Sequence, residues 1–168
     1  MEGMGELLAV DLRANFNFFL TGLRDEIGER VIPKDELFYV ATILADFAST
    51  SRNSAVGVSV PDAPSDIFDN FVLRLAELRD PTLLEIGGSQ TLLVAGFFRD
   101  QMSYRCRHNM PWYNRLGEVF YEMASDFSRT DQRQEFFWRM ARSFQDWSDI
   151  CQSLNQTLRD NRFLLQLN

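Results

Sequence analysis

The chain has 168 residues, 45% of them hydrophobic and 24% charged, and its formal net charge is −7. This composition is typical of a globular domain that is long enough to bury a core. The acidic charge argues against a nucleic-acid partner and against an anionic membrane surface, because both would need a basic face on the protein.

Helical periodicity begins near the N-terminus. Apolar residues recur at steps of three and four from Leu8 to Ile27, and a second such series runs from Leu37 to Phe47. Gly28 ends the first helix in this prediction. The first residues are acidic and lack the basic segment of a secretory signal peptide, so we expect a cytoplasmic protein whose cysteines are free thiols.

A stretch rich in Ser, Gly and Pro separates the two halves of the chain. Residues 50–65 predict one long irregular loop. Within it, residues 55–60 have the composition of a short strand but no second strand to pair with. A third helix is predicted from Ser65 to Leu78, where apolar residues return to helical spacing.

The fourth predicted helix runs from Pro81 to about residue 103. Proline suits the first position of a helix, and Asp80 suits the capping position before it. Gly87 and Gly88 predict a break in this helix, and Ser89 would cap the restarted part. Because the segment lacks the lysine and the glycine spacing of a phosphate-binding loop, we favour the break over an anion site.

Two further helices follow, one from Pro111 to Phe127 and one from Asp131 to about residue 159. The last one carries an apolar seam with alternating steps of three and four: Phe137, Met140, Phe144, Trp147, Cys151, Leu154 and Leu158. We expect the seam to pack inside its own bundle, with an intermolecular coiled coil as the alternative, because large aromatic residues suit a globular core better. The sequence thus predicts an all-α fold, a single-domain helical bundle of five to seven helices over residues 1–168.

Few residues are suited to catalysis or to metal binding. The single histidine, His108, lies between arginines and would have to serve any Ser-His or Cys-His site, with Cys106 as the nearest thiol. No histidine or cysteine has the spacing of a metal site. We therefore expect no catalytic residue, no metal and no cofactor, and we favour a non-enzymatic protein over an enzyme. A haem or metal site at His108 is a further hypothesis.

One stretch of this acidic chain is locally basic, and its arginines are Arg99, Arg105, Arg107 and Arg115. They would either anchor an anionic ligand, such as a phosphate or a carboxylate, or pair with acidic residues as an ordinary surface turn does. A ligand pocket, if the protein has one, is expected at the mouth of the two helices that flank this stretch. The candidate ligand-binding residues are Phe98, Arg99, Arg105, Arg107, His108, Tyr113 and Tyr121.

Two glycines inside predicted helices need a structural reason, because a mid-helix glycine costs about 1 kcal/mol relative to alanine. Gly96 lies in the fourth helix, and Gly117 lies in the fifth, where it shares one stripe with Tyr113 and Tyr121. We expect both glycines to be helix-packing residues, with the Gly96 helix packed on the Gly117 helix. The alternative is that the stripe forms the floor of a small pocket, with the tyrosines as its walls.

Residues 88–98, GSQTLLVAGFF, and residues 112–121, WYNRLGEVFY, resemble two motifs of a family of uncharacterised bacterial helical proteins. The family motifs are G-D-x-x-L-F-x-x-G-F-F and Y-Y-x-x-x-G-x-x-A-Y, separated by about twenty residues. The chain departs from them at Ser89, Leu93, Trp112 and Phe120. The resemblance lies near residues 81–127 and implies a bacterial, cytoplasmic, all-helical protein, but the family has no established activity.

The sequence alone favours the hypothesis that the protein acts through contact with other proteins. A homodimer is one such contact. The heptad seam and the 15 phenylalanines support this hypothesis. The alternative is a helical bundle that binds a small molecule, or an enzyme built on one, with an aromatic pocket and arginine anchors for an acidic ligand. No membrane partner is expected, because the longest apolar run, residues 91–98, is far shorter than the ~20 residues of a membrane-spanning helix.

Overall fold

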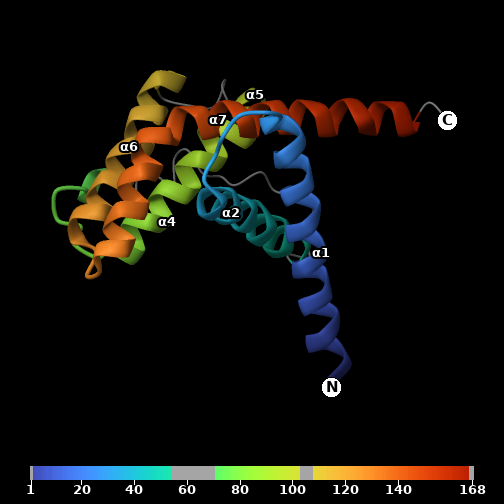
Figure 1. The fold of residues 1–168 in the computed structure, drawn as a ribbon, viewed down its shortest axis with the longest axis horizontal. Helices are drawn as coiled ribbons and strands as arrows, with labels where there is room; N and C mark the ends of the chain where they lie inside the picture. The colour runs from blue at the N-terminus through green and yellow to red at the C-terminus, as the bar shows by residue number, and fades with distance from the viewer. Residues whose placement is uncertain (1, 54–70, 103–107, 167–168) are drawn as a thin grey trace. The chain divides into compact units, whose positions relative to one another are not determined.

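The computed structural model describes residues 2–53, 71–102 and 108–166. Within these residues the chain forms six α-helices and no strand, which confirms the predicted all-α fold (Figure 1). The chain divides into two compact units, Met1–Ser59 and Val60–Asn168, and each is described by itself. That the whole chain is a single domain stays a prediction.

The first unit consists of α1, Glu2–Ile27, and α2, Lys34–Asn53. Gly28 follows α1 with a φ of 61°, a left-handed conformation that suits glycine and ends the helix as predicted. The predicted loop over residues 50–65 begins too early, because α2 continues to Asn53. The four residues from 50 to 53 contain neither glycine nor proline, so nothing in them stops the helix. Residues 54–65, with the proposed strand segment, lie outside the described residues.

The second unit begins with a turn in place of the predicted third helix. Only Val72–Arg74 is helical in residues 71–80, as a single 3₁₀ turn, η1. Asp80 is extended, with a ψ of 114°, because the ring of Pro81 excludes a helical conformation for the residue before it. The predicted helix is therefore wrong for residues 71–78, and its first residues, 65–70, lie outside the described part.

The fourth helix starts where the sequence predicts, but it is not broken at the two glycines. In α4, Pro81–Leu92, the Asp80 side chain accepts a hydrogen bond from the backbone N–H of Thr82 at 2.9 Å. The helix runs without interruption through Gly87 and Gly88, so the predicted break and the capping role of Ser89 are wrong. Both glycines are buried, which indicates that they serve a close approach between helices rather than a turn.

The interruption lies further along the chain. After α4, the segment Leu93–Phe97 forms a π-helix, η2, in which the backbone N–H of Phe98 donates to the carbonyl of Leu93 at 2.7 Å. A short α-helix, α5, follows over Arg99–Met102. A π-helical turn contains one residue more than an α-helical turn, so the α-helical hydrogen-bond pattern is interrupted here while the chain stays helical.

The last two helices form a hairpin, α6 over Met110–Phe127 and α7 over Asp131–Gln166 (Figure 1). Asn109 caps α6 by accepting a hydrogen bond from the backbone N–H of Trp112 at 3.0 Å. Since α6 has 18 residues and α7 has 36, α7 continues past its partner and beyond its predicted end near residue 159.

The apolar seam of α7 forms the core of the second unit. All of its residues except Leu158 are at most 2% exposed. Phe144 lies against Gly117 of α6, and Cys151 lies against Gly96 of η2. The prediction that the seam packs within its own bundle is confirmed, and no exposed seam is left in residues 137–154 for an intermolecular coiled coil.

Candidate functional site

The aromatic side chains proposed as pocket walls are part of the core. Tyr113 is 1% exposed, Tyr121 is 0% exposed and Phe98 is 7% exposed. The ring of Tyr121 stacks on that of Phe137 with a centroid distance of 6.0 Å, and its hydroxyl lies 3.4 Å from Oγ of Ser89. These contacts place the side chains between helices, where they stabilise packing and do not face solvent.

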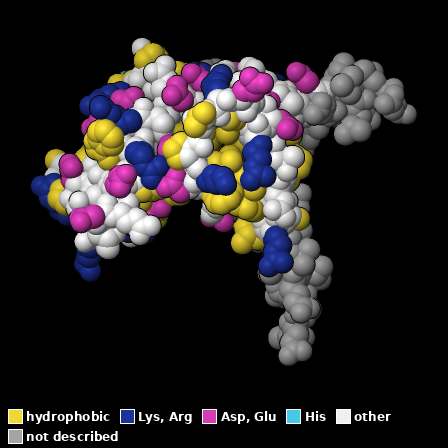
Figure 2. Space-filling view, in the orientation of Figure 1, with side chains coloured by type: hydrophobic (Ala, Val, Ile, Leu, Met, Phe, Trp, Pro, Cys, Tyr) yellow, Lys and Arg dark blue, Asp and Glu magenta, His cyan; other side chains and the backbone are white. Residues whose placement is uncertain are grey.

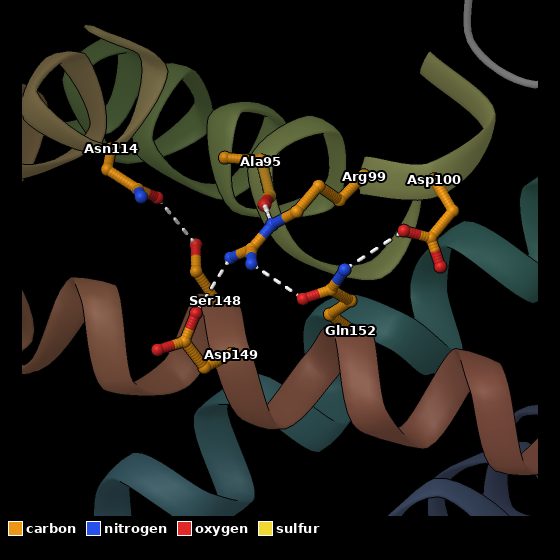
Figure 3. Close-up of polar contacts among 7 residues, drawn as sticks. All are labelled: Ala95, Arg99, Asp100, Asn114, Ser148, Asp149 and Gln152. Atoms are coloured by element: carbon orange, nitrogen blue, oxygen red, sulfur yellow. Dashed lines mark hydrogen bonds and ion pairs between the residues drawn. The ribbon is translucent and has the colours of Figure 1, made fainter. Parts of the chain in front are cut away.

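Arg99 is fully engaged by the protein itself (Figure 3). Its Nε donates to the carbonyl of Ala95 at 2.6 Å, Nη1 donates to Oε1 of Gln152 at 2.6 Å, and Nη2 lies 2.9 Å from Oδ1 of Asp149. The side chain is 19% exposed. A guanidinium with all three nitrogens already bonded is poorly suited to anchor a further anion.

A row of polar side chains on α7 continues this network. Gln152 donates to Oδ1 of Asp100 at 2.9 Å, and Gln156 donates to Oδ2 of the same carboxylate at 3.1 Å. The hydrogen bond from Gln152, with smaller contributions that include Gln156 and nearby arginines, holds the pKa of Asp100 below its ordinary value, against an opposing effect of partial burial. Asn155 donates to the carbonyl of Phe97 and, at 3.3 Å, to Oε1 of Gln101.

The network exists because η2 departs from α-helical geometry. Its carbonyl groups at Ala95 and Phe97 accept hydrogen bonds from side chains, Arg99 and Asn155, and buried carbonyls need such partners. π-Helical turns are frequent at functional sites. In this one the surrounding polar groups bind each other and the backbone, so the arrangement serves as a clamp between η2, α5 and α7. We call it the polar clamp and define it as Arg99, Asp100, Asp149, Gln152 and Asn155.

Both helix-packing glycines of the prediction lie against α7. A Cβ on Gly96 would be 3.0 Å from Cα of Ser148, and a Cβ on Gly117 would be 2.0 Å from Cζ of Phe144. The predicted packing of the fourth helix on the Gly117 helix is confirmed, since α4 packs on α6, but Gly96 and Gly117 themselves contact α7. Ser148 itself donates to Oδ1 of Asn114 at 3.0 Å, so α7 is bonded to α6 beside the glycine contact (Figure 3).

The contact between α4 and α6 uses the other two glycines. A Cβ on Gly87 would be 2.8 Å from the ring of Phe120, and a Cβ on Gly88 would be 2.8 Å from the ring of Tyr121. The flat aromatic rings thus occupy the space that the missing side chains leave. This close approach between α4 and α6 explains the two adjacent glycines. The sequence does not reveal it, because a glycine pair also suits a helix break.

Two further arginine-stretch residues, His108 and Arg115, lie within the described part of the chain. The ring of His108 stacks on Trp112 with a centroid distance of 4.0 Å and an interplanar angle of 25°. Arg115 pairs with Glu118 and Glu122 on its own helix, at 2.9 and 3.1 Å. Arg105, Cys106 and Arg107 lie outside the described residues. Their roles as ligand residues stay predictions.

Cys151 is poorly suited to nucleophilic chemistry. Its side chain is fully buried, and burial raises the pKa of the thiol to about 12, although the charge of Arg99 acts in the opposite direction. Within the described ranges, no three His, Cys, Asp or Glu side chains form a group that could hold a metal ion.

The exposed aromatic side chains of the described residues include Phe18, Phe38 and Trp138, and none of the three belongs to a predicted apolar series. Trp138 on α7 is 50% exposed, and the guanidinium of Arg142 lies over its ring, 4.5 Å from the centroid. Trp138 follows the seam residue Phe137, and its place off the seam is the signal that could have identified it. On the visible face of the second unit, acidic and basic side chains are interspersed with hydrophobic ones, without a large patch of one sign (Figure 2).

No family model matches the chain, and no curated protein and no solved structure has significant similarity to it. The resemblance to the bacterial helical family therefore receives no support from these comparisons. In the part of the chain that the structure describes, no helix has the length and apolarity needed to cross a membrane.

Proposed function

We propose that the protein is a non-enzymatic protein-interaction module that binds another protein surface through the exposed face of α7 around Trp138. The observation that carries this proposal is the half-exposed indole with Arg142 stacked on it. Tryptophan and arginine are enriched among the residues that dominate binding energy at protein interfaces.

The alternative, a small-molecule site with arginine anchors, has less support. Of its proposed residues, Arg99 is bonded through all three guanidinium nitrogens, and Tyr113 and Tyr121 are buried between helices. The raised pKa of Cys151 also disfavours covalent catalysis at that thiol. The module is proposed to act in the bacterial cytoplasm, as the sequence suggests.

Affinity capture from a lysate of the source organism tests the proposal. The wild-type protein is compared with Trp138→Ser and with Phe18→Ser, a matched control that removes an equally exposed aromatic side chain from α1. We expect Trp138→Ser to lose captured proteins, further copies of the chain included, and Phe18→Ser to retain them. Capture of the same proteins in the same amounts by wild type and Trp138→Ser would contradict the proposal.

A further inference from the structure

We infer that the surface recognised by the α7 face is the same face of a second copy of this chain, with the two α7 helices antiparallel about a two-fold axis at Trp138. The inference rests on the proposed function and names its partner. A two-fold interface uses one patch twice, so the patch must be complementary to itself. The α7 face meets this requirement through its charges.

Three exposed residues define the face. Glu135, Trp138 and Arg142 follow one another at steps of three and four, which places them on one side of the helix. All three are exposed, and the charged residues have opposite signs and flank the tryptophan at nearly equal distance along the chain. We call this set the Trp138 face.

Antiparallel pairing about Trp138 brings opposite charges together. A residue three positions before the axis then faces a residue three or four positions after it on the other helix. Glu135 of one copy therefore faces Arg142 of the second copy, and the two-fold axis makes this ion pair twice. The two indoles meet at the centre, and each guanidinium keeps its aromatic neighbour while it gains a carboxylate.

The same geometry limits the strength of the contact. It brings Asp131 towards Asp146 of the second copy, and like charges at the ends of the interface oppose association. The interface also consists mainly of one helix from each copy, which is small compared with stable dimer interfaces. We therefore expect a weak dimer whose population depends on protein concentration.

Sedimentation equilibrium of the full chain, at roughly 10 µM to 1 mM, measures this association over the range where small interfaces dissociate. We expect Trp138→Ser, Glu135→Arg and Arg142→Glu each to weaken the dimer by roughly tenfold or more. The double variant Glu135→Arg/Arg142→Glu exchanges the charges and is expected to restore the dimer to within about threefold of wild type. Glu77→Arg, an exposed acidic residue elsewhere in the second unit, is the matched control and should leave the dimer unchanged.

A further variant tests the register without relying on loss of binding. Asp146→Asn removes the like-charge contact with Asp131 and should tighten the dimer by about two- to fivefold. Because the substituted side chains are exposed, the variants should keep the wild-type circular dichroism spectrum and unfolding midpoint.

The possible failures of the inference and of the proposed function are distinguishable. A wild-type protein that stays monomeric to about 1 mM, while Trp138-dependent capture of other proteins persists, overturns the second-copy inference and leaves the proposed function standing. A dimer that the charge exchange does not restore also overturns the antiparallel register. A monomer without Trp138-dependent capture overturns both.

Discussion

The helical segment from Pro81 to Met102 is held by two different kinds of contact. Its first part, α4, approaches α6 through Gly87 and Gly88, which lie directly under aromatic rings. Its second part, η2 with α5, is attached to α7 by the polar clamp. One nearly continuous helix thus makes close glycine contacts in both parts, and it adds a concentrated set of side-chain hydrogen bonds at its irregular end, where carbonyl groups of η2 accept from side chains.

The largest effect is expected where a glycine meets a ring that cannot move. In Gly117→Ala the new methyl group would lie 2.0 Å from Cζ of Phe144, which is completely buried. We expect a loss of about 3 kcal/mol in the free energy of unfolding, despite the gain in helix propensity. Urea denaturation measures it. The double variant Gly117→Ala/Phe144→Leu should recover part of the loss, and a single variant as stable as wild type would show that the ring is not confined.

Gly96→Ala and Gly87→Ala compare a glycine of η2 that meets backbone with a glycine of α4 that meets an aromatic ring. The Gly96 methyl group would meet the backbone of Ser148 at 3.0 Å, whereas the Gly87 methyl group would meet the side chain of Phe120 at 2.8 Å. The Phe120 ring, at 2.8 Å, needs a smaller shift than the Phe144 ring at 2.0 Å, whereas the Ser148 backbone can shift only together with its helix, so we expect about 2 kcal/mol of destabilisation for Gly96→Ala and about 1 kcal/mol for Gly87→Ala. Thermal unfolding of both variants checks the order. The reverse order would mean that η2 adapts more easily than α4.

Asn155→Leu tests whether the polar clamp stabilises η2. Leucine branches at Cγ as asparagine does, but it leaves the carbonyl of Phe97 without the hydrogen bond that Asn155 donates. An unsatisfied buried carbonyl costs about 1–3 kcal/mol, and we expect a loss near the middle of that range. Gln145→Leu is the control, since Gln145 is an exposed residue of α7 outside the clamp, and it should change the free energy of unfolding by less than about 0.5 kcal/mol. Equal losses in the two variants would argue against the clamp.

The sequence predicted the helices that have clear ends. Asp80, Pro111 and Asp131 mark the predicted starts of three helices, since capping and proline signals act locally, whereas the cap at Asn109 was not predicted. It did not predict η2, because the apolar run over residues 91–98 has the same composition in an α-helix and in a π-helix. The difference depends on Asn155, which lies 58 residues from Phe97 in the chain.

For the candidate site, the sequence predicted only which side chains share one face of a helix. Periodicity placed Tyr113, Gly117 and Tyr121 on one face of a helix, but it does not tell what covers that face. The structure covers it with aromatic side chains of α7, among them Phe144, so the proposed pocket walls are core residues. The position of Trp138 beside the seam predicts an exposed side chain, but that position does not tell whether the side chain binds a partner.

The smallest expected effect is on the titration of Asp100. Its pKa is lowered chiefly by the hydrogen bond from Gln152, so Gln152→Ala should raise that pKa towards its ordinary value of 3.8. A lowered pKa in the folded state means that the contribution of Asp100 to stability is present above the ordinary value and is lost as the pH falls through the folded value. Because the carboxylate is largely exposed, solvent screens the effect, and we expect it to be a small part of the total acid sensitivity.

Carbon-detected NMR titration of the Asp100 carboxyl group, in wild type and in Gln152→Ala, measures the shift. Gln145→Ala is the matched control, since Gln145 is an exposed glutamine of α7 placed off the clamp. Only Gln152→Ala should move the midpoint, and the difference in free energy of unfolding between wild type and this variant should shrink on acidification to about pH 3. An unchanged midpoint would mean that the arginines around Asp100 set its pKa, and the clamp would then be held by charge rather than by the directed amide hydrogen bonds of α7.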